Sequence, residues 1–323
     1  MQYDLSFIIP ARNEEFLKNT VEDILKNKRG ATEVIVGLDG AWSDPPLEDH
    51  PDVNIIYYPK SIGQRAMMNR CVRLSRARYV CKVDAHCSFD EGWDVKMIDA
   101  FNELGEDDIT MVSVMRNLWA FDWKCYKCGK RVYQDKESIC PVCGTQMKKK
   151  MLWRAKRSPN STSYRFNSQL EFKYFGEYKK KQEGDLAESM SLQGSCFMAT
   201  RENYWEKELC DESWGSWGGQ GAEVAIKTWL SGGRVICNKR TWYAHMFRTK
   251  QKTGFGFPYA NPAREQKKAK NKLRDALLNN KWEKQVRPLS WLIEKFAPVP
   301  DWSDEDIASL KESETKDGRF PTS

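Results

Sequence analysis

The N-terminal part of the chain alternates between short apolar runs and segments with apolar residues at helical spacing. The runs have the length and composition of buried strands, and they span residues 5–9, 32–40, 53–59 and 78–85. Between them, residues 16–25 and 61–77 repeat apolar positions every three or four residues, which predicts helices. Because the runs do not alternate with polar residues, we expect a parallel sheet covered by helices on both faces.

The pattern continues less regularly in the rest of the chain. Residues 92–103 predict a helix, and residues 216–236 predict a glycine-bounded loop, a helix and a strand. Residues 261–285 predict a strongly charged helix, and from about Pro298 we expect a poorly ordered tail. Residues 119–152 interrupt the alternation and contain two pairs of cysteines.

Polar residues follow the predicted strands at the edge where ligands of α/β sheets bind. Pro10 to Glu14 follow the first strand, Asp39 ends the second, and Asp84 and His86 follow the fourth. Residues two apart in extended backbone project the same way, and a carboxylate with an imidazole suits a divalent cation that also binds phosphate oxygens. A turn-capping Asp84 and an ordinary strand-end His86 are the alternative.

Composition places the chain among folded globular proteins. Apolar residues make up 40% of the 323 positions and aromatic residues 12%, which argues against disorder. The N-terminus lacks a signal-peptide pattern, and no run approaches the roughly 20 apolar residues of a membrane span, so we expect a soluble cytoplasmic protein. The net charge is +7, and residues 124–181 contain 16 Lys and Arg against 4 Asp and Glu. This imbalance suggests an anionic partner, although charge runs are often only solvated surface.

The four paired cysteines have the spacing of a zinc ribbon. Cys125 and Cys128 form one Cys-X-X-Cys-Gly knuckle, and Cys140 and Cys143 form the other. Four thiolates suit tetrahedral Zn²⁺, and a closed shell of cysteines predicts a structural ion without a catalytic role. Two disulfides are the alternative, which a cytoplasmic location disfavours.

Three separated motifs resemble the GT-A glycosyltransferases, especially the polypeptide N-acetylgalactosaminyltransferases. They are "DAHC" at 84–87, "WGGQGAEVAIKTWLSGGRV" at 217–235 and "HMFR" at 245–248, and the resemblance runs in order from Leu5 to Arg248 apart from the cysteine insertion. It implies an α/β fold of the GT-A type, a Rossmann-like mixed sheet, here with an inserted zinc ribbon and a helical C-terminal region. It also implies transfer of a sugar from a UDP-sugar.

The resemblance further assigns roles to residues. Asp84, His86 and His245 match the ligands of a Mn²⁺ (or Mg²⁺) ion that bridges the diphosphate, and Trp217 and Glu223 match residues around the sugar and acceptor. The expected donor-binding set is Pro10, Ala11, Asn13, Glu14, Asp39, Gly63, Arg65, Asn69, Gly194 and Arg248. For Asp39 a turn residue, and for Arg65 a surface cation, remain open alternatives.

The sequence departs from related family-2 enzymes at Gln220-Gly221, where inverting members usually carry an acidic pair. Either Glu223 or another carboxylate then acts as the base, or the enzyme works without a base. The second option suits a retaining reaction, which we favour. Residues 248–262 combine cations, glycines and aromatics, which predicts a lid whose Arg248 and Lys250 touch phosphate. An ordinary surface loop is the alternative.

These features predict four parts of the chain. They are a nucleotide-sugar-binding half (1–118), the zinc ribbon (119–152), an acceptor half (153–260) and a basic helical C-terminal region with a tail (261–323). The leading hypothesis is a metal-dependent glycosyltransferase that modifies a hydroxymethylated pyrimidine in DNA, similar to the glycosyltransferases predicted from bacteriophage genomes. Cations and interleaved aromatics suggest the DNA contact, and they are Lys148–Lys150, Arg154, Lys156, Arg157 and Lys179–Lys181, with Tyr126, Tyr133, Trp153 and Tyr164. The alternatives are transfer to protein Ser/Thr or a surface glycan, and a non-catalytic zinc-ribbon module that binds nucleic acid.

Overall fold

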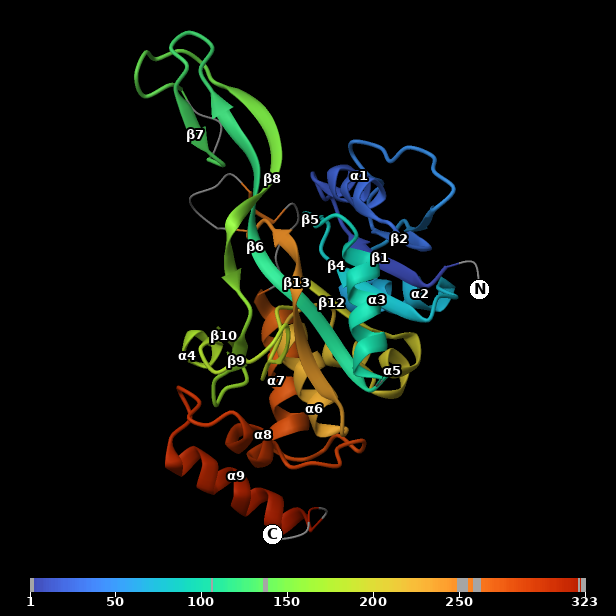
Figure 1. Ribbon diagram of the computed structural model, residues 1–323, viewed down its shortest axis with the longest axis vertical. Coiled ribbons are helices and arrows are strands. Elements are labelled where there is room, and N and C mark those ends of the chain that lie inside the picture. Colours follow the sequence, from blue (N-terminus) through green and yellow to red (C-terminus); the bar gives the residue numbers. More distant parts are fainter. Residues whose placement is uncertain are drawn as a thin grey trace.

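A mixed sheet forms the centre of the computed structural model, which describes residues 3–105, 107–135, 139–248, 255–257, 263–318 and 320. Its main path runs in the order β11-β13-β6-β12-β4-β1-β2-β3 (Figure 1). These strands are β1 (Leu5–Ala11), β2 (Thr32–Asp39), β3 (Val53–Tyr58), β4 (Tyr79–Val83), β6 (Ile109–Lys124), β11 (Leu186–Glu188), β12 (Cys196–Thr200) and β13 (Arg234–His245).

The N-terminal half of the sheet is parallel, as its apolar strands predict. β1 pairs in parallel with both β2 and β4, and β2 with β3. The sheet as a whole is mixed, because β12 lies antiparallel between β4 and β6. β12 follows a long excursion of the chain and not a single crossover helix, so nothing constrains it to run parallel. The mixed sheet expected from the GT-A resemblance is confirmed.

Helices cover both faces of this sheet and bury its alternate side chains. In β1, Ile8 packs with residues of α2 (Gln64–Leu74) and α6 (Gln220–Leu230), whereas Phe7 and Ile9 pack with residues of α1 (Leu17–Asn27) and α3 (Trp93–Leu104). The carboxyl ends of the central strands are left uncovered by these helices, and the functional site lies at that edge.

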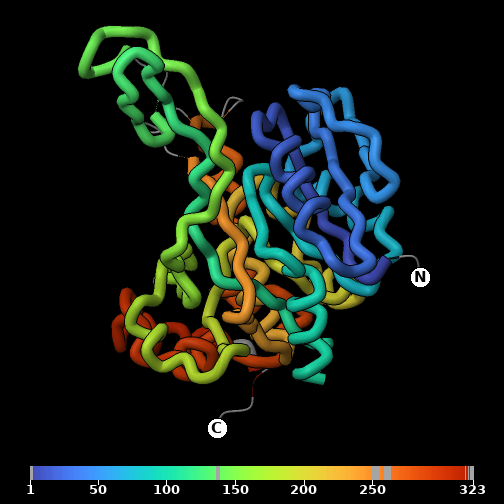
Figure 2. The backbone as a smooth tube through the Cα atoms, turned by 45° about the horizontal axis from the view of Figure 1, so that its top comes forward, coloured from blue at the N-terminus to red at the C-terminus, as the bar shows by residue number. Residues whose placement is uncertain are grey.

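A long two-stranded arm extends from the sheet (Figures 1 and 2). β6 continues out of the sheet and pairs with the antiparallel β8 (Lys148–Ser161), and β7 (Arg131–Tyr133) adds to its outer end. The expected domain boundary at residue 119 falls inside β6, so the backbone of the arm is continuous with the sheet. Trp153 Nε1 donates a hydrogen bond of 3.1 Å to Asp23 on α1, which ties the arm to the body.

The C-terminal region is folded, and the expected tail after Pro298 is wrong. α7 (Ala263–Leu278) and α8 (Leu289–Lys295) are followed by α9 (Asp304–Asp317), which Ser303 begins with a capping box. Leu310 is buried, and the Glu314 carboxylate accepts a hydrogen bond of 2.9 Å from the backbone N–H of Ser290.

The remaining elements are short connections around this framework. They are β5 (Cys87–Phe89), β9 (Tyr164–Phe166), β10 (Phe172–Tyr174), α4 (Gly176–Lys179), α5 (Arg201–Glu206) and a 3₁₀ turn (Glu212–Trp214). Within the described ranges, none of the helices combines the length and the apolar character that crossing a bilayer requires.

Candidate active site

Strand pairing brings the third expected metal ligand to the other two. β13 lies antiparallel to β5, with His245 opposite Cys87, and the Met246 N–H donates a hydrogen bond of 3.1 Å to the carbonyl of His86. Asp84 and His86 lie in the segment between β4 and β5. Residues that are far apart in the sequence therefore meet at one sheet edge.

The three side chains converge closely enough to share one ion. Asp84 Oδ2 lies 3.3 Å from His245 Nε2 and 3.9 Å from His86 Nε2. One potential ligand atom from each residue lies within 4.8 Å of the others, and both imidazoles are buried. The structure thus brings together all three predicted ligands.

The protonation of these groups suits a divalent cation. Burial lowers the pKa of His245 to about 4, so its imidazole is neutral at pH 7. Burial alone would raise the pKa of Asp84, but Lys82 and the two imidazoles hold it well below its usual range. Neither nitrogen of His245 has a hydrogen-bond partner among the described residues. An ionised carboxylate and imidazoles with free nitrogens fit Mn²⁺ or Mg²⁺ chemistry.

Two adjoining cavities open from this cluster. The larger has a volume of about 660 Å³, which is in the range of small-molecule sites. Predicted site residues line it, and they are Pro10, Ala11, Glu14, Asp39, Gly63, Asp84, His86, Trp217, His245 and Arg248. The smaller cavity, of about 390 Å³, contains Gly194 and also reaches Asp84 and Trp217. Asp84 and Trp217 therefore lie where the two cavities meet.

Comparisons with known proteins show which families and structures the chain is similar to. Residues 6–154 match the family model described as Glycosyl transferase family 2. Over 101 residues the chain is 29% identical to polypeptide N-acetylgalactosaminyltransferase 3 of Drosophila melanogaster, an alignment that covers 29% of this chain and 15% of that protein. The crystal structure of GalNAc-T7 with UDP, GalNAc and Mn²⁺ superimposes with a TM-score of 0.61 at 13% identity, covering 97% of this chain and 54% of that one. The chain has the fold of a GT-A glycosyltransferase. It spans about half the length of the GalNAc-T7 chain.

Within this GT-A fold, Asp39 both lines the larger cavity and shapes a turn. Its carboxylate accepts hydrogen bonds from the backbone N–H groups of Ile62 (2.6 Å) and Gly63 (3.1 Å) and from the Ser61 hydroxyl (2.7 Å). Gly63 has a positive φ of 92°, and a Cβ there would lie 2.7 Å from the Cβ of Ser216. The turn that Asp39 fixes is therefore part of the cavity wall, which confirms the alternative of a turn residue.

Arg65 and Glu223 do not line either cavity. They form a fully buried ion pair beneath the glycine-rich segment, where Lys227 Nζ also contacts Glu223 at 3.0 Å. Arg65 donates a further hydrogen bond of 2.8 Å to the Gly218 carbonyl. Both carboxylate oxygens of Glu223 are engaged inside the protein, which contradicts a substrate-facing role for this residue. Arg65 is buried, so the alternative of a surface cation is also wrong.

Asn69 and Asn13 also lie away from the cavities. The Asn69 amide is buried and donates to the Cys210 carbonyl at 3.0 Å, while its oxygen accepts from Tyr204 at 2.7 Å. Asn13 is exposed in the turn after β1, with a φ of 53°. The structure does not bring either side chain to the proposed donor pocket.

Arg248 is held against the site by a fragment of the predicted lid. It forms an ion pair with Glu14, and its guanidinium lies over the rings of Phe255 (4.3 Å) and Phe257 (5.3 Å). Phe257 in turn contacts Trp217, with ring centroids 5.5 Å apart. Lys250, Gly254 and most of the expected lid lie outside the described residues.

Sequence reasoning missed several residues that line the two cavities. They are Lys82, Gln193, Ser216, Phe257 and Glu265. Lys82 carried a usable signal, because it is the one charge within the apolar core of the predicted strand, residues 79–83.

The segment that departs from the acidic pair of related enzymes is packed against the backbone. A Cβ at Gly221 would lie 2.4 Å from the Leu192 carbonyl oxygen and 2.9 Å from the Gly194 nitrogen. Gln220 is buried, with its amide nitrogen 3.1 Å from the sulfur of Met68. A side chain at position 221 has no space, so a catalytic carboxylate cannot stand there in this backbone conformation.

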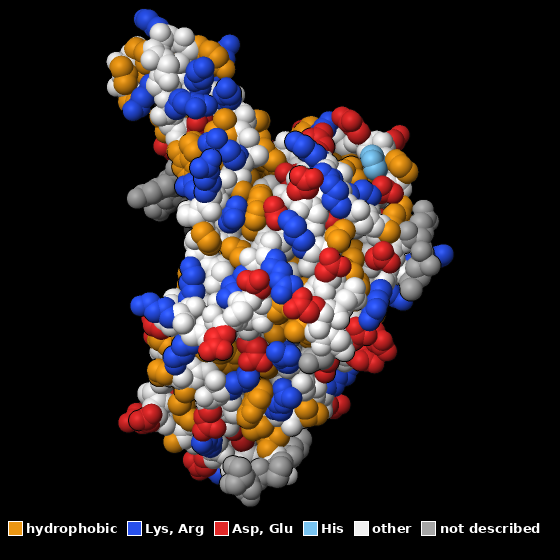
Figure 3. Space-filling view, viewed as in Figure 1, with side chains coloured by type: hydrophobic (Ala, Val, Ile, Leu, Met, Phe, Trp, Pro, Cys, Tyr) orange, Lys and Arg blue, Asp and Glu red, His pale blue; other side chains and the backbone are white. Residues whose placement is uncertain are grey.

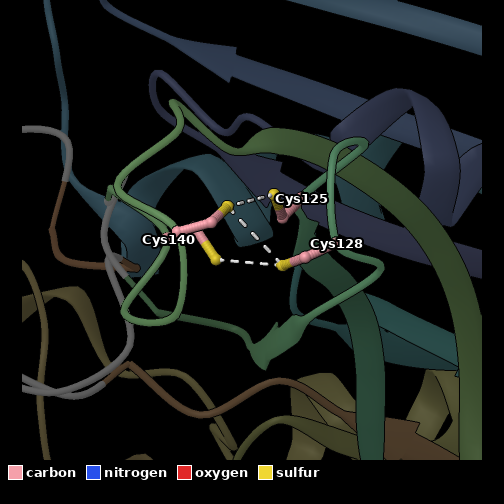
Figure 4. A group of neighbouring side chains, drawn as sticks. Cys125, Cys128 and Cys140 are labelled. Atoms are coloured by element: carbon pink, nitrogen blue, oxygen red, sulfur yellow. Dashed lines mark hydrogen bonds between the residues drawn. The ribbon is translucent and has the colours of Figure 1, made fainter.

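In the arm, the four predicted cysteines form a second cluster. Figure 4 shows Cys125, Cys128 and Cys140 with their sulfurs turned toward one another. Sulfur distances are 3.5 Å for Cys125–Cys143 and for Cys128–Cys140, close to the roughly 3.8 Å that tetrahedral Zn²⁺ requires. Hydrogen bonding at Thr145 lowers the pKa of Cys143 to about 6, which favours the thiolate. The donor set therefore fits zinc.

Replacing Gly221 by alanine tests the close contact at the cavity wall. Glycine to alanine in a helix usually stabilises by about 1 kcal/mol, but here the added methyl group clashes with the Leu192 carbonyl. We expect Gly221→Ala to lower the free energy of unfolding by about 1–3 kcal/mol in urea titrations. Gly176→Ala, also in a helix but where a Cβ meets nothing within 4 Å, is the matched control and should not lower stability. Equal stability of the two variants would contradict the packing argument.

Proposed function

We propose that the chain is a metal-dependent glycosyltransferase that moves a sugar from a UDP-sugar to a hydroxyl acceptor. The observation that carries this proposal is the meeting of Asp84, His86 and His245 where a nucleotide-sized cavity joins a smaller one. The superimposed GalNAc-T7 structure contains UDP, GalNAc and Mn²⁺, which supports the same class of donor and ion here.

Each part of the site has a role in this proposal. Asp84, His86 and His245 hold Mn²⁺ or Mg²⁺, which when bound acts as a Lewis acid toward the diphosphate. The larger cavity binds the nucleotide, with Arg248 close to the phosphates. Trp217, at the junction of the cavities, positions the sugar and excludes water from it.

The smaller cavity provides no evident general base. Among the described residues that line it, the carboxylates are Asp84 and Glu171. Lys82 engages Asp84, and Lys270 Nζ lies 3.0 Å from Glu171. Because both carboxylates are paired with cations, we favour a retaining reaction, in which the leaving phosphate oxygen accepts the proton of the acceptor hydroxyl.

Substitution of Asp84 tests the proposed activity. Asp84→Ala removes the anionic ligand, so Mn²⁺-dependent release of UDP from a mixture of UDP-sugars should fall by at least about 100-fold. Asp49→Ala, at an exposed position away from both cavities, is the control and should keep wild-type turnover. Failure of the wild type to release UDP from any donor would favour the non-catalytic binding module.

We also propose that the cysteine cluster binds a structural Zn²⁺. Its sulfurs converge without a disulfide, and Gly129 and Gly144 have the positive φ values of 77° and 67° that knuckle turns need. The outer end of the arm has a small buried cluster of Cys125, Cys140 and Met147, which is little core for an independent fold. The ion would supply the stability that this core lacks.

Metal analysis of the purified protein tests this assignment. We expect about one zinc per chain in the wild type and a clear loss in Cys140→Ser, because three thiolates bind Zn²⁺ less tightly than four. Tyr126→Ala, an exposed change in the other knuckle, should retain zinc. A wild-type protein that contains no zinc when purified from zinc-supplemented cells would contradict the assignment.

The acceptor that we propose is a hydroxymethylated pyrimidine in DNA, with the arm as the contact for the flanking strand. Lys and Arg side chains gather over the arm (Figure 3). Lys148 lies near the exposed Tyr126 ring at 5.9 Å, and Lys156 lies over Tyr133 at 4.5 Å. Cations beside exposed aromatic rings suit phosphates and unstacked bases.

The basic region expected from the sequence does not form one surface. Lys179–Lys181 lie at α4, far from the outer end of the arm (Figure 1), where Lys181 Nζ contacts the Ala297 carbonyl at 3.3 Å. Tyr164 is buried, and Trp153 is hydrogen-bonded to Asp23. The proposed DNA contact is therefore limited to the arm.

Charge-matched variants test the proposed acceptor. Lys148→Ala with Lys156→Ala should weaken salt-sensitive binding to hydroxymethylated DNA and lower the salt slope by about one per lost phosphate contact. Lys179→Ala with Lys180→Ala removes the same charge elsewhere and should leave binding unchanged.

Mass spectrometry of hydroxymethylated DNA with mixed UDP-sugars should show an added sugar. Addition to a peptide or glycan, with no change in the DNA, would support the alternative acceptors.

A further inference from the structure

Lys82 is a buried cation at the metal site for which the proposed function has so far given no role. It lies in β4, where the neighbouring side chains are also buried, and it is 3% exposed. Its ammonium pairs with Asp84 Oδ1 and donates a hydrogen bond of 2.5 Å to the Gly194 carbonyl. Lys82 is also among the residues that line the smaller cavity.

This contact divides the two oxygens of Asp84 between different partners. Oδ1 pairs with Lys82, whereas Oδ2 faces the imidazoles of His86 and His245. Lys82 therefore orients Asp84 so that one oxygen remains for a cation held together with the imidazoles. A buried lysine is costly unless it is paired, and here its partner is itself a metal ligand.

The pairing of Lys82 with Asp84 also removes the electrostatic attraction between the site and a metal ion that arrives without a nucleotide. Imidazoles bind metals in their neutral form, so the formal charges of Asp84 and Lys82 sum to zero at the ligand set. The nearby pair of Glu14 and Arg248 also sums to zero. These four side chains present no net negative charge to a divalent cation, and the ammonium at close range repels it. The negative charges of a nucleotide diphosphate would restore the attraction.

We propose that Lys82 couples metal binding to nucleotide binding, so that the divalent cation enters and leaves together with the diphosphate. This inference rests on the proposed glycosyltransferase function, and it makes Lys82 a positioning residue. In the reaction, the electron pair of the broken bond between sugar and phosphate oxygen goes to the departing UDP. The acceptor oxygen bonds to the sugar and its proton passes to the leaving phosphate oxygen, and Lys82 helps to neutralise the negative charge that develops on that oxygen while the bond breaks.

Calorimetric titration of the whole protein with Mn²⁺, with and without UDP, tests this coupling. In the wild type, UDP should tighten Mn²⁺ binding by about tenfold or more, a usual size for coupling between sites. Lys82→Gln keeps N–H donors for Asp84 and Gly194 but removes the charge. In that variant, Mn²⁺ alone should bind about tenfold more tightly and the effect of UDP should shrink accordingly.

Lys96→Gln is the matched control, because Lys96 pairs with Asp90 on the surface, at 2.7 Å, and lies outside both cavities. It should retain the wild-type coupling. Wild-type protein that binds Mn²⁺ equally well with and without UDP would overturn the inference, whatever the variants do. Equal coupling in the wild type and Lys82→Gln would also overturn it and leave the glycosyltransferase proposal intact. Wild-type protein that binds neither Mn²⁺ nor UDP would instead reject the proposed function.

Discussion

The pairing of β13 with β5 is the constraint on which the candidate site depends. Its register sets His245 opposite Cys87 and so beside His86, while β13 is also fixed along β6 in the sheet. A slip of one residue would turn the imidazole to the other face. The sheet therefore holds the three side chains in place before any ligand arrives, and the cavities open where β1, β2 and β4 end.

Buried charges support this edge from below. Arg65, Glu223 and Lys227 form a network without solvent, and Arg65 also reaches the carbonyl of Gly218 in the glycine-rich segment. Loss of one member would leave the others uncompensated in the core, which is strongly destabilising. Together with the close approach of Gly194 and Gly221, this network fixes the backbone between the two cavities.

Sequence patterns predicted the framework of the fold but not every role in the site. Long apolar runs identify β1, β2 and β4, and the strand-end rule places Asp39 and Asp84 at one edge. The resemblance supplied His245, which no local pattern would have connected to them. The resemblance placed Glu223 near the substrate, and no local pattern indicates that its ion-pair partner, Arg65, lies 158 positions away. α9 was missed because its sequence is mostly charged, although Ser303 and Asp306 carry the capping pattern.

Anomalous diffraction from crystals soaked with Mn²⁺ and UDP tests the central claim most directly. The account predicts one manganese peak within bonding distance of Asp84, His86 and His245, with the diphosphate on its open side in the larger cavity. Manganese bound elsewhere, or UDP bound away from these three side chains, would contradict it.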